Sequence, residues 1–343
     1  MERGVHTRNE ITSQPGAWAD ALDVVEKARK DLDLLLRAEY DQVLFTGCGS
    51  TYYLSLAAAA LFQESTGRIT RAVPGGELLL NPATVTAGAG KTLLVAVSRS
   101  GSTTETVRAV EQFKRQGRGP VLVITNYGDQ PLAALADLPL VIEKGQEESV
   151  AQTRSFASMY VAAAALGLRA GGCSAEYQSM LRLPEVGAKL MAGYDSLARK
   201  FGENLEFDRF YFLGSGMRYG LACEVNLKMK EMTLTHSEPF RFMEFRHGPM
   251  SMVTENAVVV GLLSEKNFSH EQTVLNEMQA MGGKILSLAE SGADVAFQSG
   301  IPESVRNVLY LPILQLMAFY RSMAKGLNPD RPNNLTAVVK LNL

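Results

Sequence analysis

The sequence predicts an α/β protein with two tandem, doubly wound parallel-sheet domains. Short apolar runs bounded by glycine alternate with longer amphipathic stretches, which is typical of β-α-β units in a parallel sheet covered on both faces. The same layout of runs appears twice along the chain. A chain of 343 residues has room for two domains, since about 100 to 200 residues per domain is usual.

Six apolar runs are the expected strands, three in each half of the chain. The runs of the first half are 42–46, 92–97 and 121–125, and those of the second half are 210–213, 257–263 and 284–288. Each run is short enough for a strand and is followed by a segment of helix length. We therefore expect one parallel sheet in each half.

The two halves repeat each other residue by residue. The segment Val43–Gly49 followed by Tyr52 matches Phe210–Gly216 followed by Tyr219 at an offset of 167, and Ser98 matches Ser264 at an offset of 166. Matching element order in two halves indicates a duplication of one α/β domain.

The repeat suggests where the domains begin and end. We expect domains at 38–185 and 200–325, with a boundary in the polar, helix-rich stretch 183–204, and a tail at 326–343 that closes on the active site. Residues 1–37 should form a helical lead-in. The apolar side chains of an amphipathic helix recur over 17–37, namely Trp18, Leu22, Val25, Leu32 and Leu36.

Composition excludes several classes of function. The net charge of −2 and a pI near 6.2 provide no basic field for nucleic acid. The start of the sequence lacks the apolar stretch of a secretory signal, and no apolar run reaches the roughly 20 residues that span a bilayer. The three cysteines form no CxxC pair and the four histidines show no HExxH spacing, so we expect no disulfide framework, metal or cofactor. A cytoplasmic protein is expected.

Two hydroxyl-rich loops of the first half are candidates for binding phosphate. Segments 47–51 (GCGST) and 98–103 (SRSGST) follow two expected strands and open two expected helices. Helix N-termini at the carboxyl ends of parallel strands offer free N–H groups and a positive dipole end to an anion. Two alternatives remain open: 102–105 (STTE) has the form of a helix capping box, and the first loop could be only a tight turn.

The second half lacks this hydroxyl cluster. Its segment 264–268 (SEKNF) stands where the first half has SRSGST, and it places the carboxylate of Glu265 in the loop. Since a carboxylate repels phosphate, only the first half is expected to bind phosphate well.

Three charged residues share one face of the helix expected after Gly216. Glu224, Lys228 and Glu231 are spaced i, i+4 and i+7. A glutamate and a lysine spaced i, i+4 on a helix usually form a surface ion pair. Here the apolar residues around the three charged residues favour a partly buried face with perturbed carboxylates. His247 precedes a Gly-Pro turn, which could hold its imidazole at the tip of a loop.

Several segments together resemble the sugar isomerase (SIS) family. They are EITSQP (10–15), GCGS (47–50), SRSGSTTE (98–105), VAQTRSF (150–156), EVNLKMKE (224–231), RHGP (246–249) and NPDRP (328–332). They resemble in particular the isomerase part of glucosamine-6-phosphate synthase and its stand-alone relatives, which include amino-sugar-phosphate deaminases. The resemblance covers nearly the whole chain and implies two flavodoxin-like SIS domains.

The resemblance also implies a role for each site residue. A phosphorylated sugar would be bound by Gly49, Ser50, Thr51, Ser98, Arg99, Ser100, Thr103, Val150 and Ala151. Glu231 would move a proton between C1 and C2 of the open-chain sugar, with Glu224 beside it and Lys228 setting its charge state. His247 would open the sugar ring, entering the site from the second subunit of a homodimer. The role of Arg99 stays open among substrate contact, an ion pair with a carboxylate and exposure to solvent.

Two departures from the synthase favour deamination. No glutaminase domain with its N-terminal cysteine precedes the isomerase region in this sequence, and Ala337 stands where the synthase has its Schiff-base lysine, with Lys340 the nearest lysine. We therefore expect conversion of glucosamine 6-phosphate to fructose 6-phosphate and ammonia. The alternatives are a deglycase acting on a fructosamine 6-phosphate, another phosphosugar aldose/ketose isomerase, and a non-catalytic phosphosugar sensor.

Overall fold

The chain forms two compact units in a computed structural model that describes residues 3–86, 88 and 90–341. The first-sheet unit contains residues 13–147, 152–184 and 336–343. The second-sheet unit contains residues 1–12, 148–151 and 185–335. The chain therefore passes between the units several times, and each unit is described by itself.

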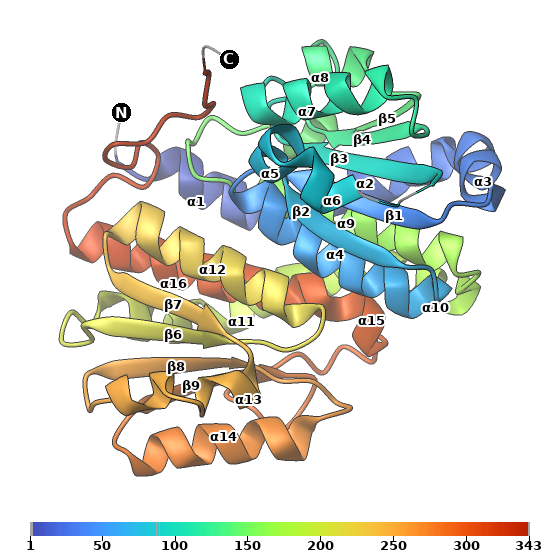
Figure 1. The fold of residues 1–343 in the computed structure, drawn as a ribbon. Coiled ribbons are helices and arrows are strands. Elements are labelled where there is room, and N and C mark those ends of the chain that lie inside the picture. The colour runs from blue at the N-terminus through green and yellow to red at the C-terminus, as the bar shows by residue number, and fades with distance from the viewer. Residues whose placement is uncertain (1–2, 87, 89, 342–343) are drawn as a thin grey trace. The chain divides into compact units, whose positions relative to one another are not determined.

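The first-sheet unit is built on five parallel strands in the order β2-β1-β3-β4-β5 (Figure 1). The strands are β1 (Gln42–Gly47), β2 (Thr70–Pro74), β3 (Thr92–Ser98), β4 (Val121–Thr125) and β5 (Leu138–Val141). The helices are α2 (Gln14–Lys27), α3 (Arg29–Arg37), α4 (Ser50–Thr66), α5 (Gly75–Leu80), α6 (Pro82–Thr86), α7 (Thr104–Arg115), α8 (Pro131–Ala134), α9 (Arg154–Ala170) and α10 (Ser174–Ser179), with 3₁₀ turns η1 (Glu143–Gly145) and η2 (Met180–Arg182).

Alternate residues of the inner strands pack against helices on opposite faces of this sheet. Leu44 of β1 lies in one apolar core with Val110 and Phe113 of α7. The next residue, Phe45, makes an edge-to-face contact with Phe62 of α4, with ring centroids 5.9 Å apart. Both faces are thus covered, which explains why β1 and β3 are apolar without alternation.

The second-sheet unit repeats this topology in the order β7-β6-β8-β9-β10, again all parallel (Figure 1). Its strands are β6 (Arg209–Leu213), β7 (His236–Phe240), β8 (Ala257–Leu262), β9 (Lys284–Ala289) and β10 (Val295–Ala296). Its helices are α1 (Val5–Thr12), α11 (Leu183–Glu203), α12 (Arg218–Thr233), α13 (Phe242–Phe245), α14 (Phe268–Ala280), α15 (Glu303–Arg306) and α16 (Leu311–Ala324), with 3₁₀ turns η3 (Pro249–Met252) and η4 (Asn307–Tyr310). The predicted α/β class with two flavodoxin-like, doubly wound sheets is confirmed.

The lead-in differs from the prediction in two ways. The expected helix over 17–37 is interrupted, because Ala28 (φ −79°, ψ 4°) leaves helical geometry between α2 and α3. The lead-in is also divided between the units: α1 packs against α16 in the second-sheet unit, whereas α2 packs against α9 in the first-sheet unit.

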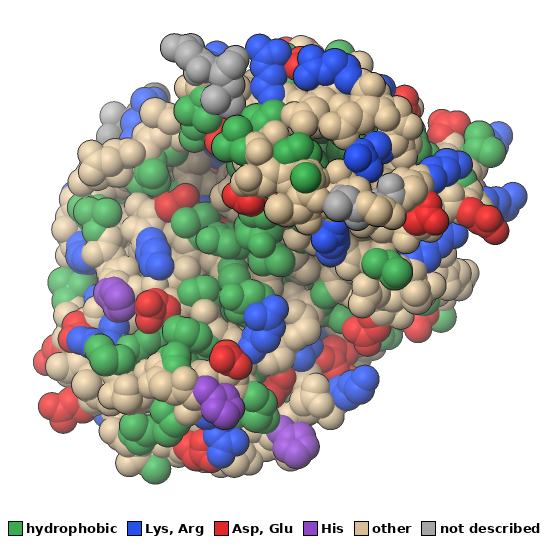
Figure 2. All heavy atoms as spheres, viewed as in Figure 1, with side chains coloured by type: hydrophobic (Ala, Val, Ile, Leu, Met, Phe, Trp, Pro, Cys, Tyr) green, Lys and Arg blue, Asp and Glu red, His purple; other side chains and the backbone are tan. Residues whose placement is uncertain are grey.

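The surface carries charges of both signs. Figure 2 shows Lys and Arg side chains interspersed with Asp and Glu over the visible face, in keeping with the net charge of −2. Within the described part of the chain, every helix is too short or too polar to pass through a bilayer.

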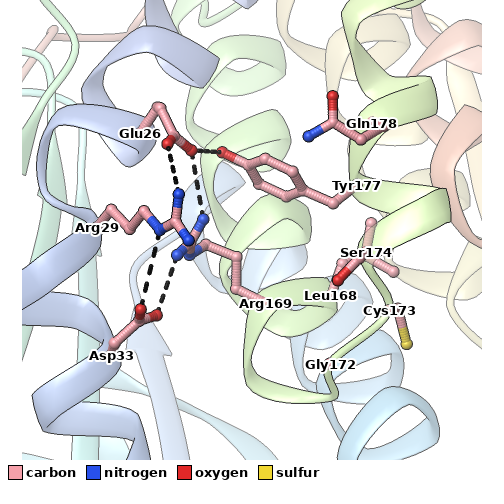
Figure 3. A pocket seen from close by; sticks show the side chains of 10 residues that line it. All are labelled: Glu26, Arg29, Asp33, Leu168, Arg169, Gly172, Cys173, Ser174, Tyr177 and Gln178. Carbon is pink, nitrogen blue, oxygen red and sulfur yellow. Dashed lines mark hydrogen bonds and ion pairs between the residues drawn. The ribbon is translucent and has the colours of Figure 1, made fainter.

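An ion-pair network fastens α2 and α3 to the end of α9. Figure 3 shows the guanidinium groups of Arg29 and Arg169 between the carboxylates of Glu26 and Asp33. Arg169 is 3.0 Å from Asp33 and 3.3 Å from Glu26, and Tyr177 of α10 donates a hydrogen bond to Glu26 at 3.2 Å. These residues line a cavity of about 300 Å³. Since the charges inside it already pair with one another, we assign the network a structural role.

Replacing Arg169 tests that role. Arg169→Met is expected to destabilise the protein by roughly 1 kcal/mol, because the side chain is only 12% exposed and two carboxylates lose the nearer of their two shared partners, with Arg29 remaining. The urea midpoint followed by circular dichroism measures the change. Lys189→Met, which breaks an exposed ion pair with Glu185 on α11, is the control, and equal midpoints for the two variants would contradict the assignment.

Candidate functional site

The two hydroxyl-rich loops of the first-sheet unit follow neighbouring strands. Loop 47–51 connects β1 to α4, loop 98–103 connects β3 to α7, and β1 and β3 pair directly. Gly49 has φ 56°, a conformation that favours glycine. At Gly47 a Cβ would lie 2.6 Å from the hydroxyl of Thr51. The glycines therefore allow the first loop to turn tightly beside the second.

Loop 98–103 directs its own hydroxyls toward its backbone. The Ser98 hydroxyl accepts a hydrogen bond from the N–H of Gly101 at 3.2 Å, and the Ser100 hydroxyl accepts one from the N–H of Ser102 at 3.3 Å. The N-cap of α7 is Thr103, without a capping hydrogen bond from its side chain. The capping-box alternative is therefore wrong, since it required Ser102 as the N-cap. The cluster of hydroxyls remains a candidate site for binding phosphate.

Arg99 forms a buried ion pair. Its guanidinium lies 3.8 Å from the Glu147 carboxylate and donates a 2.8 Å hydrogen bond to the carbonyl of Ala337. Both side chains are buried, so exposure of Arg99 to solvent is excluded. The Arg99 side chain thus links the hydroxyl-rich loop to a carboxylate and to the C-terminal tail.

Glu147 is a residue that sequence reasoning missed. Its carboxylate accepts two hydrogen bonds from Thr153, from the backbone N–H and the hydroxyl, both at 2.8 Å, and one from the Ser155 hydroxyl. It therefore joins Arg99 to the start of α9. The sequence signal that could have pointed to Glu147 is its position three residues before the VAQTRSF segment at 150–156.

The C-terminal tail of this unit lies against the start of α7. The N–H of Thr104 donates to the carbonyl of Val339 at 3.3 Å, and the N–H of Leu341 donates to the Thr104 hydroxyl at 3.0 Å. Together with the contact between Arg99 and Ala337, these bonds hold residues 337–341 beside the hydroxyl-rich loop.

The charged residues of α12 form a buried triad in the second-sheet unit. The ammonium of Lys228 lies 3.3 Å from the Glu224 carboxylate and 2.6 Å from that of Glu231. Lys228 is 1% exposed and Glu224 is fully buried, whereas Glu231 is 21% exposed. The expected burial of this face is confirmed. Glu231 is the member of the triad that a solute can reach.

The charge of Lys228 is maintained by its neighbours. Burial alone would lower the pKa of Lys228, but the two carboxylates of Glu224 and Glu231 raise it above its usual value. An ammonium that stays charged at neutral pH can donate hydrogen bonds to both carboxylates at once.

His247 lies apart from the triad on a different element. It occupies the exposed turn between α13 and η3, where Gly248 has φ 119°. Among the described residues the imidazole of His247 makes no hydrogen bond or ion pair. The predicted loop-tip position is confirmed, and its catalytic role stays a prediction.

Three of the sequence markers meet in the second-sheet unit around segment 148–151. The Glu10 carboxylate accepts the N–H groups of Glu148 at 2.6 Å and Ser149 at 3.2 Å. The N–H of Val150 donates to the carbonyl of Asp330 at 3.0 Å. The predicted site residue Val150 is thus held by Asp330 of NPDRP, and the two residues before it are held by Glu10 of EITSQP; Ala151 follows in the same unit, while the hydroxyl-rich loops belong to the other unit.

No metal centre accompanies these groups. Across residues 3–86, 88 and 90–341, His, Cys, Asp and Glu side chains form no group of three or more that could bind a metal ion. Hydroxyls and N–H donors lie at two strand ends in one unit, and a carboxylate is held by a buried ammonium in the other.

Known proteins share the sequence pattern and the fold. The SIS domain model matches residues 36–169 and 206–310. Glutamine–fructose-6-phosphate aminotransferase (isomerizing) of Pyrococcus horikoshii is 31% identical over 96% of this chain and 56% of that protein, so the chain spans about half the length of the curated relatives it matches. The crystal structure of glucosamine-6-phosphate deaminase from Thermotoga maritima is 26% identical, with a TM-score of 0.79 over 98% of this chain and 100% of that one. Tagatose-6-phosphate ketose/aldose isomerase from Escherichia coli shares the fold, with 24% identity and a TM-score of 0.86 over 96% of each chain. The chain belongs to the SIS domain family.

Proposed function

We propose that this protein is an aldose–ketose isomerase and deaminase of an amino-sugar phosphate, converting glucosamine 6-phosphate to fructose 6-phosphate and ammonia. The observation that carries the proposal is the triad of α12, in which an accessible carboxylate, Glu231, lies 2.6 Å from the buried ammonium of Lys228. A positioned carboxylate is the group required to move a proton next to a carbonyl. The likeness to a deaminase over 98% of this chain and 100% of that one supports the choice of an amino sugar.

In this proposal the hydroxyl-rich loops bind the phosphate. Ser98, Ser100, Thr103 and Thr51 supply hydroxyls, and the loops also bring N–H groups of Gly49 and Ser50 to the helix starts. Such donors suit a phosphate monoester. Val150 and Ala151 are further candidate contacts, and Arg99 supports the loop through Glu147.

The chemistry at C1 and C2 needs one base and one water. Glu231 removes the proton from C2 of the open-chain aldose and returns a proton to C1, while O1 gains a proton and the amine nitrogen loses one; the aldehyde becomes a hydroxymethyl group and C2 becomes a ketimine. Water then adds across the C2=N bond to form a carbinolamine, and the C–N bond breaks as the proton of the new C2 hydroxyl passes to the nitrogen, which leaves as ammonia. The products are the ketose phosphate and ammonia, so no oxidant, reductant or cofactor takes part.

Two further features fit this scheme. Ala337 offers no amine for a Schiff base with the ketose, and hydrolysis of a ketimine needs none. His247 has an exposed imidazole that could protonate the ring oxygen and open the sugar. By the family resemblance we propose that His247 acts from the partner subunit of a homodimer.

Ammonia release from purified protein tests the proposed function. The protein is offered glucosamine 6-phosphate, galactosamine 6-phosphate, a fructosamine 6-phosphate and amine-free sugar phosphates, and the sugar-phosphate products are measured beside ammonia. Glu231→Gln is the inactive variant and Glu255→Gln, at an exposed turn, is the matched control. Ammonia from an amino sugar, lost only in Glu231→Gln, supports the deaminase and identifies the epimer. Turnover of only the fructosamine indicates a deglycase. Turnover of only amine-free sugar phosphates indicates a simple isomerase, and binding without turnover indicates a sensor.

The phosphate assignment makes a separate prediction. Ser100→Ala is expected to raise KM about tenfold with little change in kcat, because one hydrogen bond to a charged phosphate is lost far from the reacting carbons. Steady-state kinetics on the active substrate measure the split. Ser174→Ala, at an exposed position of the same unit, should leave both constants unchanged. An unchanged KM in Ser100→Ala would remove Ser100 from the phosphate site.

A further inference from the structure

The loop after β8 shares one hydrogen bond between a serine side chain and the backbone with the hydroxyl-rich loop after β3. The N–H of Asn267 donates to the Ser264 hydroxyl at 2.9 Å, as the N–H of Gly101 donates to the Ser98 hydroxyl at 3.2 Å. Both pairs are related by the repeat offset of 166. The second-sheet unit therefore keeps this serine and its hydrogen bond to the backbone, but segment 264–268 lacks the other hydroxyls of segment 98–103.

The loop after β6 likewise keeps the geometry of the loop after β1. Gly216 has φ 57° and Gly49 has φ 56°. The N–H of Arg218 donates to the carbonyl of Ser215 at 3.2 Å, and the N–H of Thr51 donates to that of Cys48 at 3.3 Å. At the offset of 167, the second repeat thus has an arginine, Arg218, where the first has the hydroxyl of Thr51.

In the second-sheet unit the carboxylate of Glu303 accepts hydrogen bonds from the residues that follow both β6 and β8. One oxygen of Glu303 accepts the N–H groups of Glu265 at 3.0 Å and Lys266 at 3.3 Å. The other oxygen accepts a hydrogen bond from the guanidinium of Arg218. Two adjacent backbone N–H groups and a guanidinium form the kind of donor set that binds an oxyanion.

The surroundings of Arg218 indicate an anion site rather than a surface ion pair. The side chain is 5% exposed, and its second carboxylate partner, Glu271, is buried as well. Within the described residues, the Nε of Arg218 has no acceptor. Glu303 comes from α15 and is 21% exposed, so it is the partner that opens toward solvent.

The structure also corrects the sequence-based view of this loop. Glu265 does not hold its carboxylate against the loop: it is an exposed residue whose carboxylate pairs with Arg306 at 3.1 Å. The carboxylate at the loop is that of Glu303, 38 residues further along the chain.

We infer that the Glu303 carboxylate is a built-in ligand that fills an anion-binding loop of the second repeat, and that removing it makes this loop bind a small oxyanion. The inference does not depend on the proposed enzymatic activity, because it concerns only contacts within the second-sheet unit. The duplicated loop would thus keep its anion-binding donors as a structural element, with a carboxylate of the same chain in place of an anion from solution. One repeat of the chain remains open to phosphate.

Anion-dependent stability of Glu303→Ala tests the inference. The full-length protein is used in a Ser98→Ala/Ser100→Ala background, so that the loop of the first repeat contributes little binding. Sodium formate and inorganic phosphate are the probes, with sodium chloride at equal ionic strength as the reference. We expect Glu303→Ala to melt below its parent and to recover at least half of the lost Tm with either probe, in a saturable manner.

The matched control is Glu265→Ala. It also removes one carboxylate beside the loop after β8, but it leaves the Glu303 carboxylate, which accepts the N–H groups of that loop. It should show no anion-specific recovery. Equal responses of Glu303→Ala and Glu265→Ala to both probes would overturn the inference. Should Glu303→Ala fail to fold in chloride, refolding in formate supports the inference, and failure in formate and phosphate alike, while Glu303→Gln folds, contradicts it.

Discussion

Glu231→Gln is expected to lower kcat on the amino-sugar phosphate by about 10³-fold, within the 10² to 10⁴ range that a general base contributes. The amide keeps the size and one acceptor oxygen of the carboxylate, but it cannot carry the proton between C2 and C1. Since the hydroxyl-rich loops are unchanged, KM should stay within about threefold of its original value. Product assays and steady-state kinetics measure both constants.

An isotope readout separates loss of the base from loss of fold. In D₂O the original protein should place deuterium on C1 of the ketose, because the proton carried by Glu231, 21% exposed, can exchange with solvent. Glu231→Gln should lose this incorporation together with turnover, while Glu255→Gln retains both. Retention of more than about a tenth of kcat by Glu231→Gln would assign the proton transfer to another group.

The sequence predicted the inner strands of both sheets and missed all four edge strands. The six predicted runs correspond to β1, β3, β4, β6, β8 and β9. The missed strands β2, β5, β7 and β10 form the two edges of each sheet. An inner parallel strand is buried on both faces and reads as a continuous apolar run, whereas β2 and β7 contain proline and exposed polar residues, which a strand edge tolerates.

In the candidate site, too, the features within one short segment were predictable and the contacts between distant segments were not. Residue types within one loop or one helix turn predicted the hydroxyl cluster of 98–103 and the shared face of Glu224, Lys228 and Glu231. The partners of Arg99 and of the loop after β8 were not predictable. Glu147 and Glu303 lie 48 and 38 residues from the groups they bind, and no periodicity connects a loop carboxylate to a donor at that separation.

Lys228→Met is expected to destabilise the protein by about 3 kcal/mol, near the lower end of the cost of breaking a buried pair. The substitution leaves the carboxylates of Glu224 and Glu231 without the ammonium that lies between them. Because the folded-state pKa of Lys228 is raised, its stabilisation is fully present below the usual value of 10.5 and is lost only as pH rises through the folded-state pKa. The loss should therefore be constant from pH 7 to 9.

A double variant separates the lost charge from lost packing. If the uncompensated carboxylates cause the instability, Lys228→Met/Glu224→Gln should be more stable than Lys228→Met alone, since one buried negative charge is removed. Urea unfolding at pH 8 of the two single variants and the double variant measures the coupling between Lys228 and Glu224. Lys230 is an exposed lysine on the same helix, so Lys230→Met should leave the urea midpoint unchanged. Simple additivity of the two single substitutions would mean that the ammonium and Glu224 do not stabilise each other, and the instability of Lys228→Met would then have to come from lost packing or from the pair with Glu231.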